Sequence, residues 1–408
     1  MILSFEIANY RSFKGKTTFQ MEATAAKCKA QNLVNVSIPN EELRLLKTTL
    51  IYGANASGKT TLIRGLYALC GEIAGTLGNQ GGDNVYIYEP FALDAESSGQ
   101  PSTMKISYLV NGIKYDYYVK FNEESFLEER LDYYPNTKLS VKLFSRQQEG
   151  EIAIPEYGNS LLAKDKPKIK AYKNKLLLSK FILDTPHDII TPAAKYLSSI
   201  GFANSYNSNM KDKLWKESVK LLESSDEYKK NLRKILSYVD LGIRDFELPE
   251  DRKLDNVSLI HSAKSPILHN IIKMTGESLG TKILFLLGPK ILQSLETGSP
   301  LFIDEVDTSF HSFISDFIIK MFTSEKLNPK HAQLIIVTHD ITLMNEDLLR
   351  RDQIWFTEKN KNGISSLFAL SDFEDVRETT PFAKWYLASK FGAVPSISDV
   401  EELFDGQD

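Results

Sequence analysis

Apolar and polar residues alternate along the first part of the chain, and this alternation predicts β-strands. The clearest runs are Ile2 to Ile7, Thr17 to Met21 and Met104 to Phe121. Residues 46–52 (LKTTLIY) predict a buried strand, because apolar and β-branched residues dominate them. A glycine-rich loop and a helical pattern follow that strand. The first third of the chain is therefore expected to build sheets.

The pattern changes after about residue 125. Between residues 160 and 240, lysine and leucine recur at helical spacing, for example in KESVKLLESSDEYKKNLRKILSYV. From about residue 258, a helical pattern near Ser278 alternates with strand-like runs, which predicts a parallel sheet. These runs are Pro300 to Asp304, Gln333 to Thr338 and Gln353 to Glu358.

Together these patterns predict an α/β fold with a mixed-sheet lobe, a parallel-sheet core and an inserted helical lobe. The first and third segments are expected to form one discontinuous domain around the second segment. The expected segments are residues 1–124, residues 125–257, which are mainly helical, and residues 258–408.

Composition narrows the class of protein. The 408 residues are 42% hydrophobic and 25% charged, as in an ordinary globular protein, and the net charge of -4 gives no global positive field. The two cysteines, Cys28 and Cys70, argue against disulfides or a zinc site. No apolar stretch approaches the ~20 residues that span a bilayer, and the alternating N-terminus is unlike a signal peptide. We therefore expect a cytoplasmic protein that makes no membrane contact.

The strongest chemical signal is the run from Gly53 to Thr60 (GANASGKT), which fits the pattern GxxxxGK[ST] between a strand and a helix. Its glycines allow consecutive N–H groups to face phosphate oxygens, and the helix N-terminus adds its positive end. Lys59 is expected to contact the β- and γ-phosphates, and Thr60 to bind Mg²⁺. A glycine turn with a solvated lysine fits this context poorly. The expected nucleotide contacts are Gly53, Asn55, Ala56, Ser57, Gly58, Lys59, Thr60 and Thr61.

Two further strand ends carry candidate catalytic groups. An apolar run ends in Asp304-Glu305, which is electrostatically costly unless a cation lies nearby. Asp304 is expected to bind Mg²⁺ with Thr60, and Glu305 to polarise the attacking water. His339 ends the next strand, where it is expected to contact the γ-phosphate or the water. Alone, these residues are an acidic strand end and a structural histidine; beside a phosphate loop, the catalytic interpretation is favoured.

Ser278 and Gly280 begin the amphipathic helix that precedes these strands. A serine and a glycine at a helix N-terminus present a hydroxyl and free N–H groups to an anion. In isolation, an ordinary cap by Ser278 is the better interpretation. The order of the elements along the chain favours the anion-binding alternative: phosphate loop, Ser-x-Gly helix, Asp-Glu strand and His strand.

That order resembles the ABC ATPases, and longer stretches resemble the AAA-type ATP-binding proteins of the SMC/RecF/OLD branch, which occur in bacterial abortive-infection and phage-defence operons. The resemblance implies an ABC-ATPase-type fold, ATP and Mg²⁺ as cofactors, and ATP hydrolysis. The matching stretches are NYRSF, IYGANASGKTTLI, YEPFALD, LLLSKFILDTPHDI, ESLGTK, LFIDEVDTSFH, VTHD, LRRDQIWFTEKNKNG and YLASKFGAVPSI.

The resemblance also implies roles for residues outside the phosphate loop. Arg11 and Ser12 are expected to lie against the nucleotide, and Asp307 to couple two sites. Ser278 and Gly280 are expected to face the nucleotide of another copy, so that the active site forms in a homodimer or a higher homo-oligomer.

Two parts of the family pattern have no clear counterpart or role. The glutamine that ABC ATPases use to sense Mg²⁺ and water is missing from its usual setting, and Gln100 is a poor substitute. The segment Arg350, Arg351 and Asp352 matches a family motif to which no function is assigned.

The resemblance implies an ATPase subunit of an anti-phage system that controls a separate effector, such as a nuclease or toxin from the same operon. Fewer than 70 residues follow His339, too few for a Toprim nuclease lobe. The alternatives are a RecF- or SMC-like DNA-repair ATPase that binds DNA with ATP, and a nucleotide-dependent scaffold without turnover. Six lysines between Lys164 and Lys175 would suit nucleic acid, although a solvated face explains them better.

Overall fold

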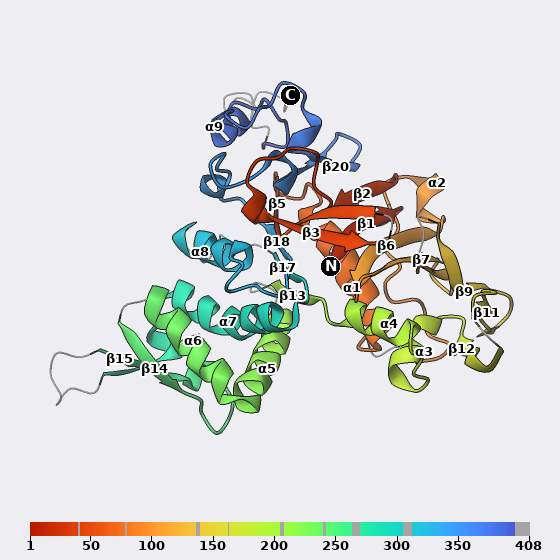
Figure 1. Ribbon diagram of the computed structural model, residues 1–408, viewed down its shortest axis with the longest axis horizontal. Helices are drawn as coiled ribbons and strands as arrows, with labels where there is room; N and C mark the ends of the chain where they lie inside the picture. The colour runs from red at the N-terminus through yellow and green to blue at the C-terminus, as the bar shows by residue number, and fades with distance from the viewer. Residues whose placement is uncertain are drawn as a thin grey trace, which may run out of the picture.

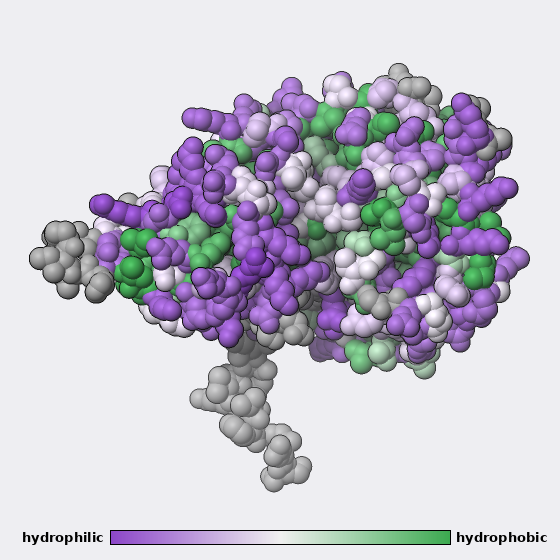
Figure 2. All heavy atoms as spheres, turned by 90° about the horizontal axis from the view of Figure 1, so that it is seen from below, coloured by the Kyte–Doolittle hydropathy of each residue, from purple (hydrophilic) through white to green (hydrophobic). Residues whose placement is uncertain are grey.

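The computed structural model shows an α/β molecule built from an antiparallel sheet, a largely parallel core sheet and a group of helices (Figure 1). Seen from below, hydrophilic residues cover most of the surface, and hydrophobic residues form small separate groups (Figure 2). The structure describes residues 1–39, 41–77, 80–135, 139–161, 163–204, 208–239, 242–262, 270–304 and 312–395. Among the helices of these segments, none is both long enough and apolar enough to cross a membrane.

Seven strands form the antiparallel sheet, in the order β11-β9-β8-β7-β6-β1-β2. The strands predicted from the N-terminal alternation and from residues 104–121 are confirmed, and buried residues recur at every second position along β7, as a half-buried strand requires. The strands are β1 Ile2–Ala8, β2 Thr17–Gln20, β6 Ser102–Val110, β7 Ile113–Phe121, β8 Phe126–Tyr134, β9 Val141–Gln147 and β11 Glu156–Tyr157.

The core sheet has six strands in the order β13-β17-β18-β5-β19-β20, and the predicted parallel core is confirmed. Only the edge strand β20 runs antiparallel to its neighbour. Every residue of β5, β17 and β18 is buried, which explains their nearly continuous apolar sequences. The strands are β5 Thr48–Gly53, β13 Gly201–Asn204, β17 Leu301–Asp304, β18 Leu334–Val337, β19 Ile354–Lys359 and β20 Ser365–Ala369.

The core sheet separates two hydrophobic cores, because successive residues of a strand point to opposite faces. Ile335 and Val337 pack into the core shared with α1 and the antiparallel sheet, whereas Leu334 and Ile336 pack into the core shared with α5 to α8. The helices are α1 Lys59–Ala74, α2 Ala95–Ser98, α3 Leu177–Leu183, α4 Ile190–Ser198, α5 Ser208–Ser224, α6 Asp226–Val239, α7 Leu279–Thr297, α8 Ser312–Thr323 and α9 Phe382–Leu387.

Smaller strand pairings complete the fold. One is a two-stranded pair that leads into β5, one is a short pair near the antiparallel sheet, and one is a three-stranded sheet before α7. Their strands are β3 Leu33–Ile38 with β4 Glu41–Leu46, β10 Ile152–Ala153 with β12 Ala171–Tyr172, and β14 Ile243–Glu247, β15 Ser258–His261 and β16 Ile271–Lys273.

The expected change to helical structure at residue 125 is wrong, because β8, β9 and β11 extend the antiparallel sheet. The charged residues Glu129 and Arg146 interrupt the apolar pattern by which these strands could have been predicted. Both side chains are fully buried and form an ion pair of 3.4 Å. Glu129 also accepts the backbone N–H groups of Leu177 and Leu178 at the start of α3, each at 2.8 Å. Among the described residues after 125, the first α-helix is therefore α3, and the division of the chain into an ATPase domain and an inserted lobe stays a prediction.

Candidate nucleotide-binding site

A glycine-bounded loop connects the end of β5 to the start of α1. Gly53 and Gly58 have φ angles of 151° and 120°, which side chains disfavour. A side chain at Gly53 would collide with the carbonyl oxygen of Thr357, and one at Gly58 would come within 2.7 Å of the Ser365 hydroxyl. Gly58 occupies the N-cap of α1 and supplies no side-chain cap. The backbone N–H groups of the first helical turn are therefore available to an anion.

The hairpin of β19 and β20 holds this loop in place. The Ser57 and Thr357 hydroxyls share a hydrogen bond of 2.5 Å, and the Ser365 hydroxyl donates to the Ser57 carbonyl at 2.6 Å. The Ser365 N–H donates to the Ser12 carbonyl at 2.7 Å. The loop is thus fixed before any ligand arrives, which lowers the entropic cost of binding. Sequence reasoning missed Thr357 and Ser365, because only the fold brings them to the loop.

Lys59 lies folded over the same loop. Its side chain is buried at 6% exposure, and its ammonium donates to the carbonyls of Gly53 at 2.8 Å and Ala54 at 3.0 Å. These contacts place the positive charge of Lys59 at the loop, where it would contact a bound phosphate.

A second group of polar side chains meets beside the loop. Asp304, at 4% exposure, accepts from the Thr60 hydroxyl at 3.4 Å and from the Asn204 amide at 3.1 Å. Asn204 and Asp304 are register partners at the ends of the parallel strands β13 and β17. A divalent cation beside Thr60 would stabilise this buried carboxylate. Hydroxyl, carboxylate and amide oxygens are the donors that Mg²⁺ prefers.

Asn204 was not among the residues expected from the sequence. It ends a strand of only four residues, inside the stretch whose lysine and leucine spacing predicts helix. Because it pairs in register with Asp304, Asn204 lies beside the candidate metal site. No counterpart of the ABC-family glutamine was found in the sequence, so Asn204 is an additional amide at this site.

The loop opens into a cleft of about 520 Å³, a volume within the usual range for small-molecule sites. The Ser12 hydroxyl is buried there without a hydrogen-bond partner among the described residues, so a ligand atom would satisfy it. Arg11, with φ of 49°, binds the Glu89 carboxylate through its Nε at 2.8 Å. The cleft is lined by Arg11, Ser12, residues 55–61, residues 89–93, His339, Lys359 and Gly363. The glycine-bounded loop, the buried lysine and the unpaired Ser12 hydroxyl together fit a nucleoside triphosphate.

His339 follows β18 and reaches the same cleft with an exposed side chain. The next residue, Asp340, accepts a hydrogen bond from the Tyr52 hydroxyl through its carbonyl at 3.2 Å, which ties this strand end to β5. Glu305 and Asp307 lie outside the described residues, so their expected roles stay predictions.

Ser278 and Gly280 lie elsewhere. Ser278 occupies the N-cap of α7 and accepts the Thr281 N–H at 3.1 Å, as an ordinary cap does. Ser278 is exposed, Leu279 beside it is 55% exposed, and neither Ser278 nor Gly280 lines the cleft. Within one chain, the structure therefore separates this helix start from the phosphate loop.

Comparison of the sequence with models of protein families assigns the chain to a family. The model described as "AAA domain, putative AbiEii toxin, Type IV TA system" matches residues 48–345, well over half of the chain. The chain belongs to this AAA-domain family. The match confirms the resemblance to AAA-type ATP-binding proteins, and the comparison with curated proteins gives no match.

Solved structures give a distant likeness to this AAA-domain protein. The SMC head domain from Thermotoga maritima is 14% identical with a TM-score of 0.43, over 90% of this chain and 98% of that chain. An SMC head bound to the C-winged helix domain of ScpA is also 14% identical, with a TM-score of 0.44 over 90% of this chain and 97% of that chain.

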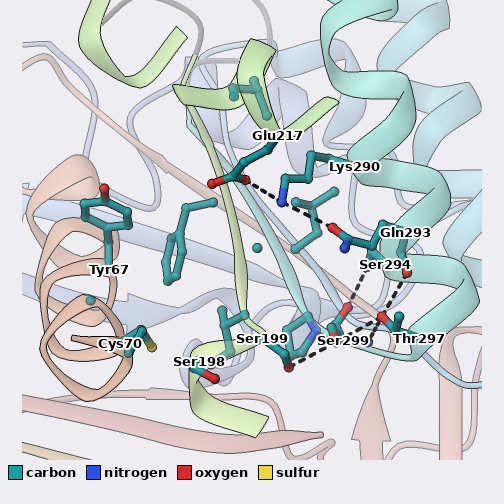
Figure 3. Close-up of a pocket in the computed structure, with 18 of the residues that line it drawn as sticks. Tyr67, Cys70, Ser198, Ser199, Glu217, Lys290, Gln293, Ser294, Thr297 and Ser299 are labelled. Atoms are coloured by element: carbon teal, nitrogen blue, oxygen red, sulfur yellow. Dashed lines mark hydrogen bonds and ion pairs between the residues drawn. The ribbon is translucent and has the colours of Figure 1, made fainter. Parts of the chain in front are cut away.

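The AAA-domain chain has a second cavity, of about 320 Å³, between α1, α5 and α7 (Figure 3). Glu217 and Lys290 point toward one another on one side, with an ion pair of 2.5 Å, and Tyr67 and Cys70 of α1 lie on the other side. This cavity shares no lining residue with the cleft at the phosphate loop. Its lining adds hydroxyl, amide and apolar groups to this ion pair but contains no stretch of the Gly53–Thr60 loop, so it lacks the features that fit a triphosphate.

Proposed function

We propose that the chain binds ATP with Mg²⁺ in the cleft at the phosphate loop and hydrolyses it. The observation that carries this proposal is the meeting of the preformed Gly53–Thr60 cradle with the buried Asp304. Backbone N–H groups and Lys59 hold the triphosphate, and the Ser12 hydroxyl and Arg11, which line the same cleft, also contact it.

Hydrolysis needs a metal site and a positioned water. Thr60 and Asp304 would hold Mg²⁺, which when bound neutralises charge on the phosphate oxygens. The Asn204 amide keeps the Asp304 carboxylate oriented. Glu305 follows Asp304 directly and acts as the general base for the water, while His339 contacts the γ-phosphate or that water.

We also propose that a second copy completes the site. Ser278 is exposed, Gly280 is half-buried, and neither lines its own cleft, yet their helix start suits an anion. In a two-fold dimer, the α7 helix of each copy would close the cleft of the other, and Asp307 would lie in the segment that couples the two sites.

The broader role that we propose is in anti-phage defence by abortive infection, in the cytoplasm. The family description, which refers to AbiEii toxin and type IV toxin–antitoxin systems, supports this role. In this role ATP turnover controls a separate effector, such as a nuclease or toxin from the same operon. Co-expression tests it: a neighbouring gene should be toxic alone, and this chain should suppress the toxicity in a Lys59-dependent manner.

A DNA-repair role gains no support from the described lysines between Lys164 and Lys175. Lys173 forms an ion pair with Glu151 at 3.1 Å, and no aromatic stacking accompanies the run. Tight, salt-sensitive duplex binding that requires ATP would favour the repair role over defence.

Mixing two inactive variants tests the shared site. Lys59→Ala breaks the cradle, and Ser278→Arg places a bulky cation at the helix start. Each variant alone should show no ATP turnover. A mixture should recover partial turnover, because one of the two composite sites in the mixed dimer is intact. Wild-type turnover by the Ser278→Arg protein alone would contradict sharing between copies.

A further inference from the structure

The cleft has two chemically different ends, and the strand order of the core sheet distinguishes them. β17 and β18, which carry Asp304 and His339, lie on one side of β5, and the β19–β20 hairpin lies on the other. A triphosphate in the Gly53–Thr60 cradle has its γ end beside Thr60 and Asp304, because these residues offer the metal ligands. Its other end must then leave toward the hairpin.

At the hairpin end, two segments that the sequence analysis left without a role meet. The same cleft is lined by residues 89–93, from the stretch YEPFALD, by Lys359 at the end of β19, and by Gly363 in the turn before β20. The first segment is anchored by the Phe91 N–H, which donates to the Asn9 side chain at 3.1 Å. The turn is anchored by Asn360, whose side-chain oxygen accepts the N–H groups of Asn362 at 2.9 Å and Ile364 at 3.0 Å. Both segments are therefore held by their own hydrogen bonds.

The two segments touch through Leu93. A side chain added at Gly363, which has φ of 74°, would collide with the Leu93 methyl group, so Leu93 packs directly on the glycine backbone. Leu93 is nevertheless 73% exposed. A leucine that packs on the hairpin on one side and lines the cleft on the other offers an apolar contact to a ligand in that cleft.

We propose that Leu93, packed on Gly363, forms the surface on which the base of the bound nucleotide rests. This inference rests on the proposed function, since it names the part of ATP that the cleft holds beyond the phosphates. Leu93 is thus a specificity-determining residue, distinct from the groups that hold the triphosphate. The apolar contact makes a nucleotide bind more tightly than the bare phosphate chain.

Calorimetric titration of the full chain with ATP and with inorganic tripolyphosphate, each with Mg²⁺, tests this inference. The wild-type chain should bind ATP more tightly than tripolyphosphate. Leu93→Ala should weaken ATP binding about tenfold, the effect of losing one buried aliphatic contact, and leave tripolyphosphate binding unchanged. Leu93→Met should keep most of the ATP affinity, because it keeps an apolar side chain of similar size. The matched control Leu387→Ala, at another exposed leucine in α9 (63%), should change the affinity for neither ligand.

The outcomes separate this inference from the proposed function. If Leu93→Ala leaves ATP binding unchanged, or weakens ATP and tripolyphosphate equally, the inference is overturned while ATP binding in the cradle stands. If the wild-type chain binds neither ligand, or Lys59→Ala binds both as well as wild type, the proposed function itself fails.

Discussion

The helices α1 and α7 both begin at a place that suits an anion, but the two places are built differently. α1 starts at Gly58 without a side-chain cap, inside a cleft, with the buried Lys59 as its first residue. α7 starts at Ser278, whose hydroxyl already caps the helix, on an exposed surface. The first start is prepared for a ligand by its own chain, whereas the second would supply only one face of a site in the proposed dimer.

Removing the buried lysine should have the largest effect. Lys59→Ala deletes the charge that lies over the loop, and the isolated chain should lose roughly 10- to 100-fold in ATP affinity, as expected for charge-assisted hydrogen bonds. Lys282 in the first turn of α7 is the matched control, because it is also a lysine near a helix start and its ammonium donates to the Thr275 carbonyl at 3.0 Å, away from the phosphate loop. Lys282→Ala should leave ATP affinity of the isolated chain intact in calorimetry. An equal loss of ATP affinity in the two variants would show that the start of α1 is no better suited to ATP than the start of α7.

A change at the start of α7 should act on assembly. Ser278→Asp keeps an N-cap side chain, so the melting temperature should stay close to that of wild type. The added negative charge would repel the phosphates of a partner's nucleotide, so ATP-dependent dimerisation and turnover should be lost while ATP binding by a single chain persists. Measuring the mass of the protein in solution with ATP and Mg²⁺ checks whether dimerisation is lost. Normal dimers of the Ser278→Asp protein would show that α7 does not face a nucleotide.

A smaller effect is expected from Asn204 of β13, which contacts the Asp304 carboxylate beside the phosphate loop. Asn204→Leu removes the amide that orients Asp304, and the Mg²⁺ concentration needed for half-maximal ATP binding should rise several-fold, in line with one hydrogen bond to a charged group. Tripolyphosphate binding without Mg²⁺ should not change, and Asn204→Gln should restore part of the loss. An unchanged Mg²⁺ requirement in the Asn204→Leu protein would remove Asn204 from the site.

Local sequence patterns predicted the parts of this molecule that local forces determine. The glycine loop, the alternating strands and the buried core strands follow from spacing alone, so the positions of Gly53 to Thr60, Asp304 and His339 at the ends of core strands could be predicted, while their chemical roles stay predictions. The strands near Glu129 and Arg146 were missed, because a buried ion pair satisfies charges that normally mark a surface. Asn204, Thr357 and Ser365 were missed because strand pairing, not sequence distance, brings them to the loop.

The ties between the phosphate loop and the last hairpin have a consequence for synthesis of the chain. The hydroxyls of Thr357 and Ser365 meet Ser57 across 300 and 308 residues of sequence. While a ribosome is still making the middle of the protein, the loop lacks the side chains that hold it, and contacts of such long sequence separation form late in folding. A nascent chain should therefore be unable to bind a nucleotide until the β19–β20 hairpin has emerged, so incomplete chains would not bind or hydrolyse ATP.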